Sequence, residues 1–243
     1  MIATHAIRQP LAPSSFLRQR AGVWVLVAAY NEGERLGATL AALCDEYANV
    51  VVVDDGSRDD TSEVASRYPV WLLQHLVNCG QGAALQTAID FALRQGAEIL
   101  VTFDADGQHV PEDIDRLVDA VRAGRGDMVL GSRFLGRAAG VPWSRWLVLR
   151  LGVLFTRLFS HIRVTDTHNG LRAMSRHAAQ RIHITLDRMA HASEILDQIR
   201  LHGLGFCEVP VTIRYSPATL AKGQSSWNAF KIVGQLVLGR LIR

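Results

Sequence analysis

The sequence predicts an α/β fold built on a doubly wound, mostly parallel sheet. From residue 23 onward, short apolar runs alternate with segments of helical periodicity, an order typical of parallel strands covered by helices. Three of these apolar runs end in acidic or polar residues, which indicates strands whose carboxyl ends meet at one edge of the sheet. The length of 243 residues fits one such domain.

The expected elements follow from the hydrophobic periodicity of each segment. Strands are expected where apolar residues run without a break, and helices where they recur every three or four positions. Pro111 stands where proline favours the first turn of a helix. The expected strands are 23–29, 50–53, 98–103, 128–131 and 206–215, and the expected helices are 34–47, 59–68, 82–95, 111–123 and 192–202.

The alternation breaks after about residue 135. We expect a single domain over residues 1–243, with a nucleotide-binding half at 22–134 and an acceptor half at 135–243 that contains amphipathic helices. No internal repeat or low-complexity segment interrupts either half.

Composition restricts the class of protein. With 49% hydrophobic and 20% charged residues, the chain has the profile of a soluble globular protein. Its net charge of +3 is small and no basic aromatic motif is present, so we expect no nucleic-acid binding. Cys44, Cys79 and Cys207 form no pair at metal-ligand spacing, which favours reduced thiols and a cytoplasmic protein. We find no apolar signal-peptide core and no run of 18 apolar residues that would predict a membrane span.

Two carboxylates two positions apart, Asp104 and Asp106, follow the apolar run 99–103. If the backbone stays extended there, both side chains point to the same side and can address one cation. Carboxylate oxygens suit Mg²⁺ or Mn²⁺ carrying a substrate diphosphate. The alternative is that both are turn residues before the helix at Pro111.

Other acids are expected at the same edge. The segment "VVVDDGSRDDT" (51–61) is a strand that ends in Asp54 and Asp55, and "VAAYNEGERL" (27–36) is a strand that ends in Asn31 and Glu32. Crowded carboxylates repel one another unless a cation or hydroxyl groups lie among them. The pattern therefore favours a ligand site at this edge.

Six motifs in order resemble those of the family 2 glycosyltransferases, and within them the dolichyl-phosphate mannose synthase-like and polyprenyl-phosphate glycosyltransferases. The resemblance covers roughly residues 22–215. It implies the GT-A fold, a Rossmann-like sheet, and an inverting transfer of a sugar from a nucleotide sugar to a polyprenyl phosphate. The motifs are "VAAYNE", "VVVDDGSRDDT", "NCGQGAALQTAI", "FDADGQH", "GSRF" and "DTHNGLRA".

The resemblance also implies roles for individual residues. The nucleoside of a GDP- or UDP-sugar would contact Ala29, Tyr30, Glu32, Asp54 and Asp55. The segment "GQGAALQ", which opens a helix, would meet the nucleotide or sugar through Gln81, where many relatives have lysine. Mg²⁺ or Mn²⁺ would be held by Asp104, Asp106 and Gln108, with Asp106 also counted as catalytic.

On the acceptor side, the resemblance makes Asp166 the residue that orients or deprotonates the acceptor. It also makes Arg133, expected just after a strand end, and Arg145 the residues that hold the lipid phosphate. Asp166 could equally be a turn residue before Asn169. The histidines near the motifs, His109, His168 and His191, are expected at the surface or behind the ligands.

Residues 145–161, "RWLVLRLGVLFTRLFSH", have apolar side chains on one half of a helical wheel and basic or polar ones on the other. Such a helix fits a membrane surface, although packing on the protein core explains the same pattern. We therefore expect a peripheral enzyme at the cytoplasmic face of a membrane. The alternatives are a glycosyltransferase for a soluble or polysaccharide acceptor and a subunit that binds a nucleotide sugar without turnover.

Overall fold

The computed structural model describes residues 2–5, 20, 22–139, 146, 150, 153, 162–186 and 190–215. Its strands are β1 (Ile2–His5), β2 (Val23–Ala29), β3 (Val50–Asp54), β4 (Trp71–His75), β5 (Ile99–Asp104), β6 (Met128–Ala139), β7 (Arg172–Ser175) and β8 (Phe206–Arg214). Its helices are α2 (Gly33–Glu46), α3 (Thr61–Ser66), α4 (Gln81–Arg94), α5 (Glu112–Arg122), α7 (Arg176–Ala179) and α8 (Ala190–Leu201).

The strands form one eight-stranded sheet in the order β1-β4-β3-β2-β5-β7-β6-β8. The pairs β3–β4, β2–β3, β2–β5 and β6–β8 are parallel, whereas β1 and β7 run antiparallel to their neighbours. Strands β2, β3 and β5 are buried on both faces, as expected from sequences that are apolar except for Thr102 and the terminal acids of β3 and β5. The predicted doubly wound, mostly parallel sheet is confirmed.

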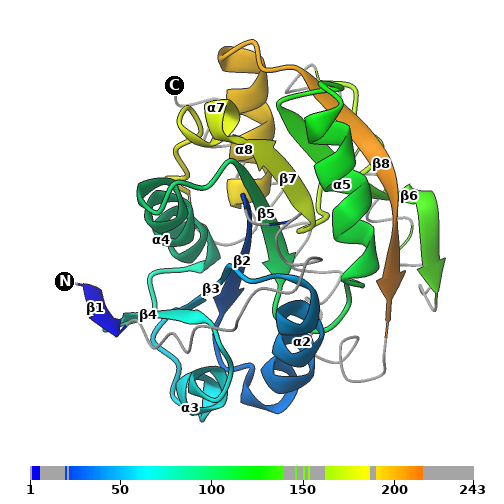
Figure 1. The fold of residues 1–243 in the computed structure, drawn as a ribbon. Coiled ribbons are helices and arrows are strands. Elements are labelled where there is room, and N and C mark those ends of the chain that lie inside the picture. The colour runs from blue at the N-terminus through cyan, green and yellow to red at the C-terminus, as the bar shows by residue number, and fades with distance from the viewer. Residues whose placement is uncertain are drawn as a thin grey trace.

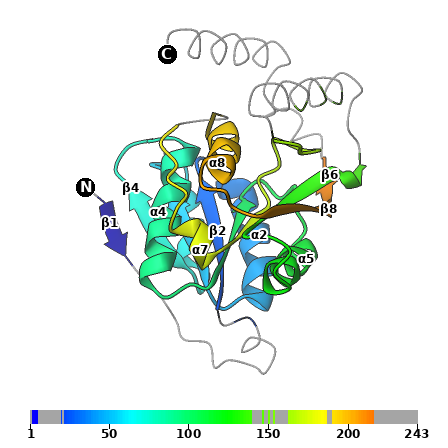
Figure 2. The same ribbon diagram turned by 90° about the horizontal axis from the view of Figure 1, so that it is seen from above.

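Helices cover both faces of the sheet (Figures 1 and 2). One apolar core lies between the sheet and α2, α3 and α5, and it includes Leu36, Leu40 and Ile114. The other lies between the sheet and α4, α7 and α8, and it includes Leu85, Ile89 and Leu196. The described structure thus consists of three layers, and the edge formed by the carboxyl ends of β2, β3 and β5 stays open to a ligand.

The structure also corrects parts of the prediction. Strands β1, β4 and β7 were not expected, because each is short and carries little periodicity of its own. Strand β6 continues to Ala139 instead of ending at Gly131, so Arg133 lies inside a strand and not after one. Strands β7 and β8, from the predicted acceptor half, complete the same sheet as β2–β6.

The predicted amphipathic helix at 145–161 lies mostly outside the described residues, as does Arg145. Within the part of the chain that the structure describes, no helix is both long and apolar enough to cross a membrane.

Candidate functional site

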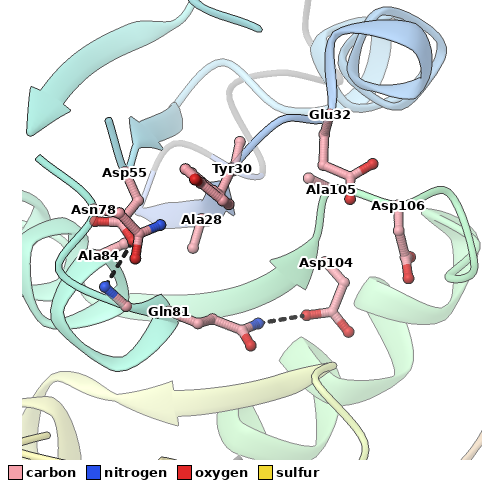
Figure 3. A pocket seen from close by; sticks show the side chains of 12 residues that line it. Ala28, Tyr30, Glu32, Asp55, Asn78, Gln81, Ala84, Asp104, Ala105 and Asp106 are labelled. Carbon is pink, nitrogen blue, oxygen red and sulfur yellow. Dashed lines mark hydrogen bonds between the residues drawn. The ribbon is translucent and has the colours of Figure 1, made fainter. Parts of the chain in front are cut away.

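A cleft of about 460 Å³ opens at the carboxyl ends of β2, β3 and β5. Figure 3 shows Asp55 and Asn78 at one end, Asp104 and Asp106 at the other, and Tyr30 between them. The lining residues are Ala28, Ala29, Tyr30, Glu32, Asp55, Asn78, Gly80, Gln81, Ala84, Asp104, Ala105 and Asp106. The structure therefore brings together most of the donor-side residues that the sequence predicts.

Asp104 is the last residue of β5, and Asp106 follows in the turn after it. Both side chains point to the same side in Figure 3, although the backbone turns at Ala105 and Asp106 instead of staying extended as the prediction assumed. Asp104 accepts hydrogen bonds from Nε2 of His109 at 3.0 Å and from Nε2 of Gln81 at 3.4 Å. Asp106 accepts two from Gln108, one from its backbone N–H at 3.0 Å and one from its side-chain amide at 2.5 Å. Gln108 thus holds Asp106 in place from outside the cleft lining.

His109 is buried and lies behind Asp104, one of the two placements expected for the histidines near the motifs. Its Nε2–H donates to Asp104, whereas its Nδ1 has no partner among the described residues. Gly170 packs against the same carboxylate, because a Cβ atom at that position would lie 2.1 Å from Oδ2 of Asp104. The contact of Gly170 with Asp104 joins segments far apart in the sequence, and the contact of His109 with Asp104 depends on the turn between them. The motif pattern reveals neither contact.

The two acids of this pair differ in acidity. Burial raises the pKa of Asp104, but the hydrogen bond and charge of His109, together with the charges of Arg172 and His191, outweigh it and leave the pKa below its ordinary value. Burial and the charge of Asp104 raise the pKa of Asp106 above its ordinary value, against the hydrogen bonds of Gln108. A divalent cation between the two groups would relieve this repulsion, so the all-oxygen donor set fits Mg²⁺ or Mn²⁺.

At the other end of the cleft, Asp55 fixes the loop before α4. Its carboxylate accepts the backbone N–H of Cys79 at 2.9 Å and that of Gly80 at 2.7 Å, and it bonds Nδ1 of His75 at 2.7 Å. Gly80 has a φ of 94°, a left-handed conformation that glycine adopts without strain, and α4 begins at the next residue, Gln81. The predicted opening of a helix at "GQGAALQ" is confirmed, and its first turn faces the cleft.

Asp54 has a different position from Asp55, although the two are adjacent. Its carboxylate accepts hydrogen bonds from the backbone N–H of Ser57 at 2.9 Å and from the hydroxyl of Ser62. It is buried and is not among the cleft-lining residues. Asp54 thus holds the turn between β3 and α3, and the hydroxyl of Ser57 in turn accepts the backbone N–H of Asn31 beside Glu32.

A second polar cluster lies around Asp166. The carboxylate of Asp166 accepts the Nε–H of Arg133 at 2.6 Å and the backbone N–H of the same residue at 3.1 Å. Arg133 also donates to the hydroxyl of Tyr215 at 2.5 Å and to the carbonyl of His168 at 3.1 Å. The ion pair is buried, with 8% and 1% of the two side chains exposed. Neither residue lines the cleft described above.

Comparison with known proteins adds to this geometry. A family model described as "Glycosyl transferase family 2" matches residues 24–182. Polyprenol monophosphomannose synthase of Mycolicibacterium smegmatis is 30% identical over 236 residues, which cover 90% of this chain and 88% of the relative. UDP-N-acetylglucosamine–dolichyl-phosphate N-acetylglucosaminyltransferase of Methanococcus voltae is 30% identical over 239 residues, which cover 89% of this chain and 95% of the relative.

Among solved structures, glucosyl-3-phosphoglycerate synthase from Mycobacterium tuberculosis in complex with Mn²⁺ and UDP-glucose is similar, with a TM-score of 0.66. The match covers 97% of this chain and 86% of that protein at 19% identity. At that identity the likeness bears on the fold alone, and it confirms the predicted GT-A fold.

Proposed function

Because the chain belongs to glycosyl transferase family 2, and is therefore a glycosyltransferase, we propose that it transfers a sugar from a nucleotide sugar to a polyprenyl phosphate. The observation that carries this proposal is the cleft with one acid, Asp55, at one end and the pair Asp104 and Asp106 at the other. One end would take the nucleoside and the other the diphosphate with its cation.

For contact with the nucleoside we propose Ala29, Tyr30, Glu32 and Asp55, all of which line the cleft. Carboxylates accept hydrogen bonds from the N–H groups of a base and the hydroxyl groups of a ribose. Asp54 does not reach the cleft, so its contribution is to hold the turn that positions this end.

The first turn of α4 would meet the phosphates or the sugar. Its backbone N–H groups have no partner within the helix, and the positive end of a helix favours negative charge. Gln81 stands at this point, lines the cleft and already bonds Asp104. A glutamine there donates a hydrogen bond without a charge, so the diphosphate charge would be balanced mainly by the cation.

Asp104 and Asp106 would hold Mg²⁺ or Mn²⁺, with Gln108 orienting Asp106. When bound, such a cation offsets the charge that grows on the departing nucleoside diphosphate. His109 and Gln108 keep both carboxylates in position for it. The two relatives are named for different sugars, so both GDP- and UDP-sugars remain candidate donors.

A lipid phosphate as acceptor is supported by the names of both relatives, which act on polyprenol and dolichyl phosphate. The oxyanion of such an acceptor is already a nucleophile near neutral pH and needs no strong base. Asp166 is bound to Arg133 in a buried ion pair, so we assign it the role of orienting the acceptor side. Arg133 would bind a phosphate only by exchanging one of its present acceptors, and Arg145 is proposed as its partner.

The acceptor tail must remain in lipid while its phosphate reaches the cleft. We propose that residues 145–161 lie on the cytoplasmic surface of a membrane with their apolar half toward the acyl chains. Replacing Leu151 and Phe155 by serine should then release the protein from anionic liposomes without lowering its melting temperature.

The test is a transfer assay with labelled GDP- and UDP-sugars against polyprenyl phosphate in vesicles and against soluble acceptors, with Mn²⁺ present. We expect a lipid-extractable product with one donor class, lost in excess chelator and lost in Asp106→Asn. Equal transfer to a soluble acceptor, with no effect of vesicles, would replace the lipid proposal by the soluble-acceptor alternative. Full activity in excess chelator would refute the metal assignment.

A further inference from the structure

Three side chains with different ligand atoms converge beside the nucleoside end of the cleft. Asp55 follows β3, His75 is the last residue of β4, and Cys79 precedes α4. A carboxylate oxygen, an imidazole nitrogen and the thiol sulfur of these residues all lie within 4.8 Å of one another. His75 and Asp55 are 7% and 3% exposed, whereas Cys79 is exposed and leaves the cluster open on one side.

We propose that Asp55, His75 and Cys79 form a second cation site, selective for a soft or borderline divalent ion such as Zn²⁺ or Cd²⁺. Tetrahedral Zn²⁺ is bound by sulfur, nitrogen and oxygen atoms at about 2.0–2.3 Å, which places its ligand atoms roughly 3.3–3.8 Å apart. The three atoms need only small adjustments to reach that spacing. The fourth position would face solvent on the side of Cys79.

The ligand types separate this site from the pair Asp104 and Asp106. Oxygen-only sites suit Mg²⁺ and Mn²⁺, whereas a thiolate with an imidazole selects softer ions. The two sites also stand at opposite ends of the cleft, since Asp55 and Asp104 line its two ends (Figure 3). Each could therefore be occupied in the presence of the other ion.

Thr87 of α4 supports the imidazole in either state. Its hydroxyl lies 3.0 Å from Nε2 of His75, and a hydroxyl can both donate and accept a hydrogen bond. Without a cation, Nδ1–H of His75 donates to Asp55 at 2.7 Å and Thr87 donates to Nε2. With a cation on Nδ1, the proton moves to Nε2 and Thr87 accepts it, an arrangement common behind metal-bound histidines.

The hydrogen bonds of Asp55 explain the conformation of the loop before α4, but they do not require a thiol at position 79. Asp55 holds residue 79 by accepting the backbone N–H of that residue, a group that every amino acid except proline has. The sulfur contacts the carbonyl of Val77 at 3.3 Å, a weak interaction that the loop does not require. The thiol is thus the group that turns a loop clamp into a set of three ligands.

Occupancy should oppose the donor, because Asp55 cannot serve a cation and a nucleoside with the same oxygens. This consequence rests on the proposed function, whereas the cation site itself does not. Zn²⁺ would then inhibit transfer at saturating Mn²⁺ and would raise the concentration of nucleotide sugar needed for half the maximal rate.

Binding is tested first, on the full chain freed of metal, by titration with Cd²⁺ followed through the ultraviolet thiolate-to-cadmium band. We expect one equivalent to bind, with the band lost in Cys79→Ser and kept in the double variant Cys44→Ser and Cys207→Ser. His75→Gln retains the thiol and should weaken binding by at least tenfold. No band in the wild type, or a band kept in Cys79→Ser, overturns the site. Equal affinity in His75→Gln reveals a lone thiol and also overturns it.

The second arm measures inhibition by Zn²⁺ with excess Mn²⁺, each variant being compared with its own zinc-free rate. Cys79→Ser should raise the Zn²⁺ concentration for half inhibition by at least tenfold, and melting temperatures check that the variants are folded. If Cd²⁺ binds as described but Zn²⁺ leaves nucleotide binding unchanged, the coupling to the donor is refuted while the cation site stands. Absence of transfer with every donor would refute the proposed function without affecting the Cd²⁺ result.

Discussion

Replacing Gly170 by alanine should damage the cation site while leaving the fold intact. Gly170 packs directly against the carboxylate of Asp104, and its carbonyl accepts the hydroxyl of Thr102 at 2.6 Å. An added Cβ would lie 2.1 and 2.3 Å from the two carboxylate oxygens and 2.5 Å from the carboxyl carbon. Real Cβ contacts lie beyond 3.0 Å, so the carboxylate must move by about 1 Å.

The group expected to move in this contact is the carboxylate, because the hydroxyl of Thr102 in β5 holds the carbonyl of Gly170. Moving a cation ligand by about 1 Å is enough to lower kcat/KM by about 100-fold, or about 2.7 kcal/mol. We expect that loss together with a higher Mn²⁺ concentration for half activation. The melting temperature should fall by only a few degrees, because the apolar cores are untouched.

Gly205→Ala is the matched control, since a Cβ there would have its nearest neighbour, Cα of Gly126, at 3.7 Å. It should keep wild-type kcat/KM and Mn²⁺ dependence. Transfer by Gly170→Ala within twofold of wild type, with an unchanged Mn²⁺ requirement, would refute the placement of Asp104 in the cation site. A large fall in the melting temperature would instead show that Gly170 is needed for the fold. The Mn²⁺ affinity of Asp104→Asn would then be measured, and an affinity equal to that of the wild type would refute Asp104 as a cation ligand.

Asp106→Ala should abolish transfer without unfolding the protein, and wild-type rates in that variant would contradict its assignment as a cation ligand. Asp55→Ala should weaken binding of the free nucleoside diphosphate in calorimetry, because the loop before α4 loses its clamp; an unchanged affinity with lost turnover would move this acid to the chemical step. Asp166→Ala should destabilise the fold by about 3–5 kcal/mol in urea unfolding, since it leaves the buried charge of Arg133 unpaired, and a loss below 1 kcal/mol would show that the pair is not buried in solution. Burial lowers the pKa of His168 to about 4, against the charge of Asp166 and together with the charges of neighbouring arginines. As pH drops from 6.5 to 4 the unfolded chain binds a proton at this residue before the folded protein does, so the free energy of unfolding should fall by about 2–3 kcal/mol. His168→Gln should flatten that part of the stability profile, and a profile identical to that of the wild type would refute the burial of the ring.

The sequence alone predicted the central part of the fold and the acids at its edge. The runs at 23–29 and 50–53 are apolar throughout and that at 99–103 is apolar except for Thr102, a pattern typical of parallel strands buried on both faces. Since the carboxyl ends of parallel strands meet, the acids that follow them had to lie near one another. The structure places Asp55, Asp104 and Asp106 in one cleft, as expected.

Neighbouring positions in a motif can nevertheless differ in orientation. Asp54 and Asp55 look equivalent in "VVVDDGS", yet the first bonds Ser57 and Ser62 and the second faces the cleft. Successive side chains of a strand point to opposite faces, so one residue of register decides which acid meets the ligand. The motif by itself does not specify that register.

Contacts between distant segments were decided only by the tertiary structure. The pairing of Arg133 with Asp166 spans 33 residues, and it depends on β6 continuing past Gly131. The cluster of Asp55, His75 and Cys79 exists because the unpredicted strand β4 lies next to β3 and delivers His75 to Asp55. Periodicity and composition encode which local structure a segment adopts, whereas strand order and register arise from packing among all segments at once, and those decide which side chains meet.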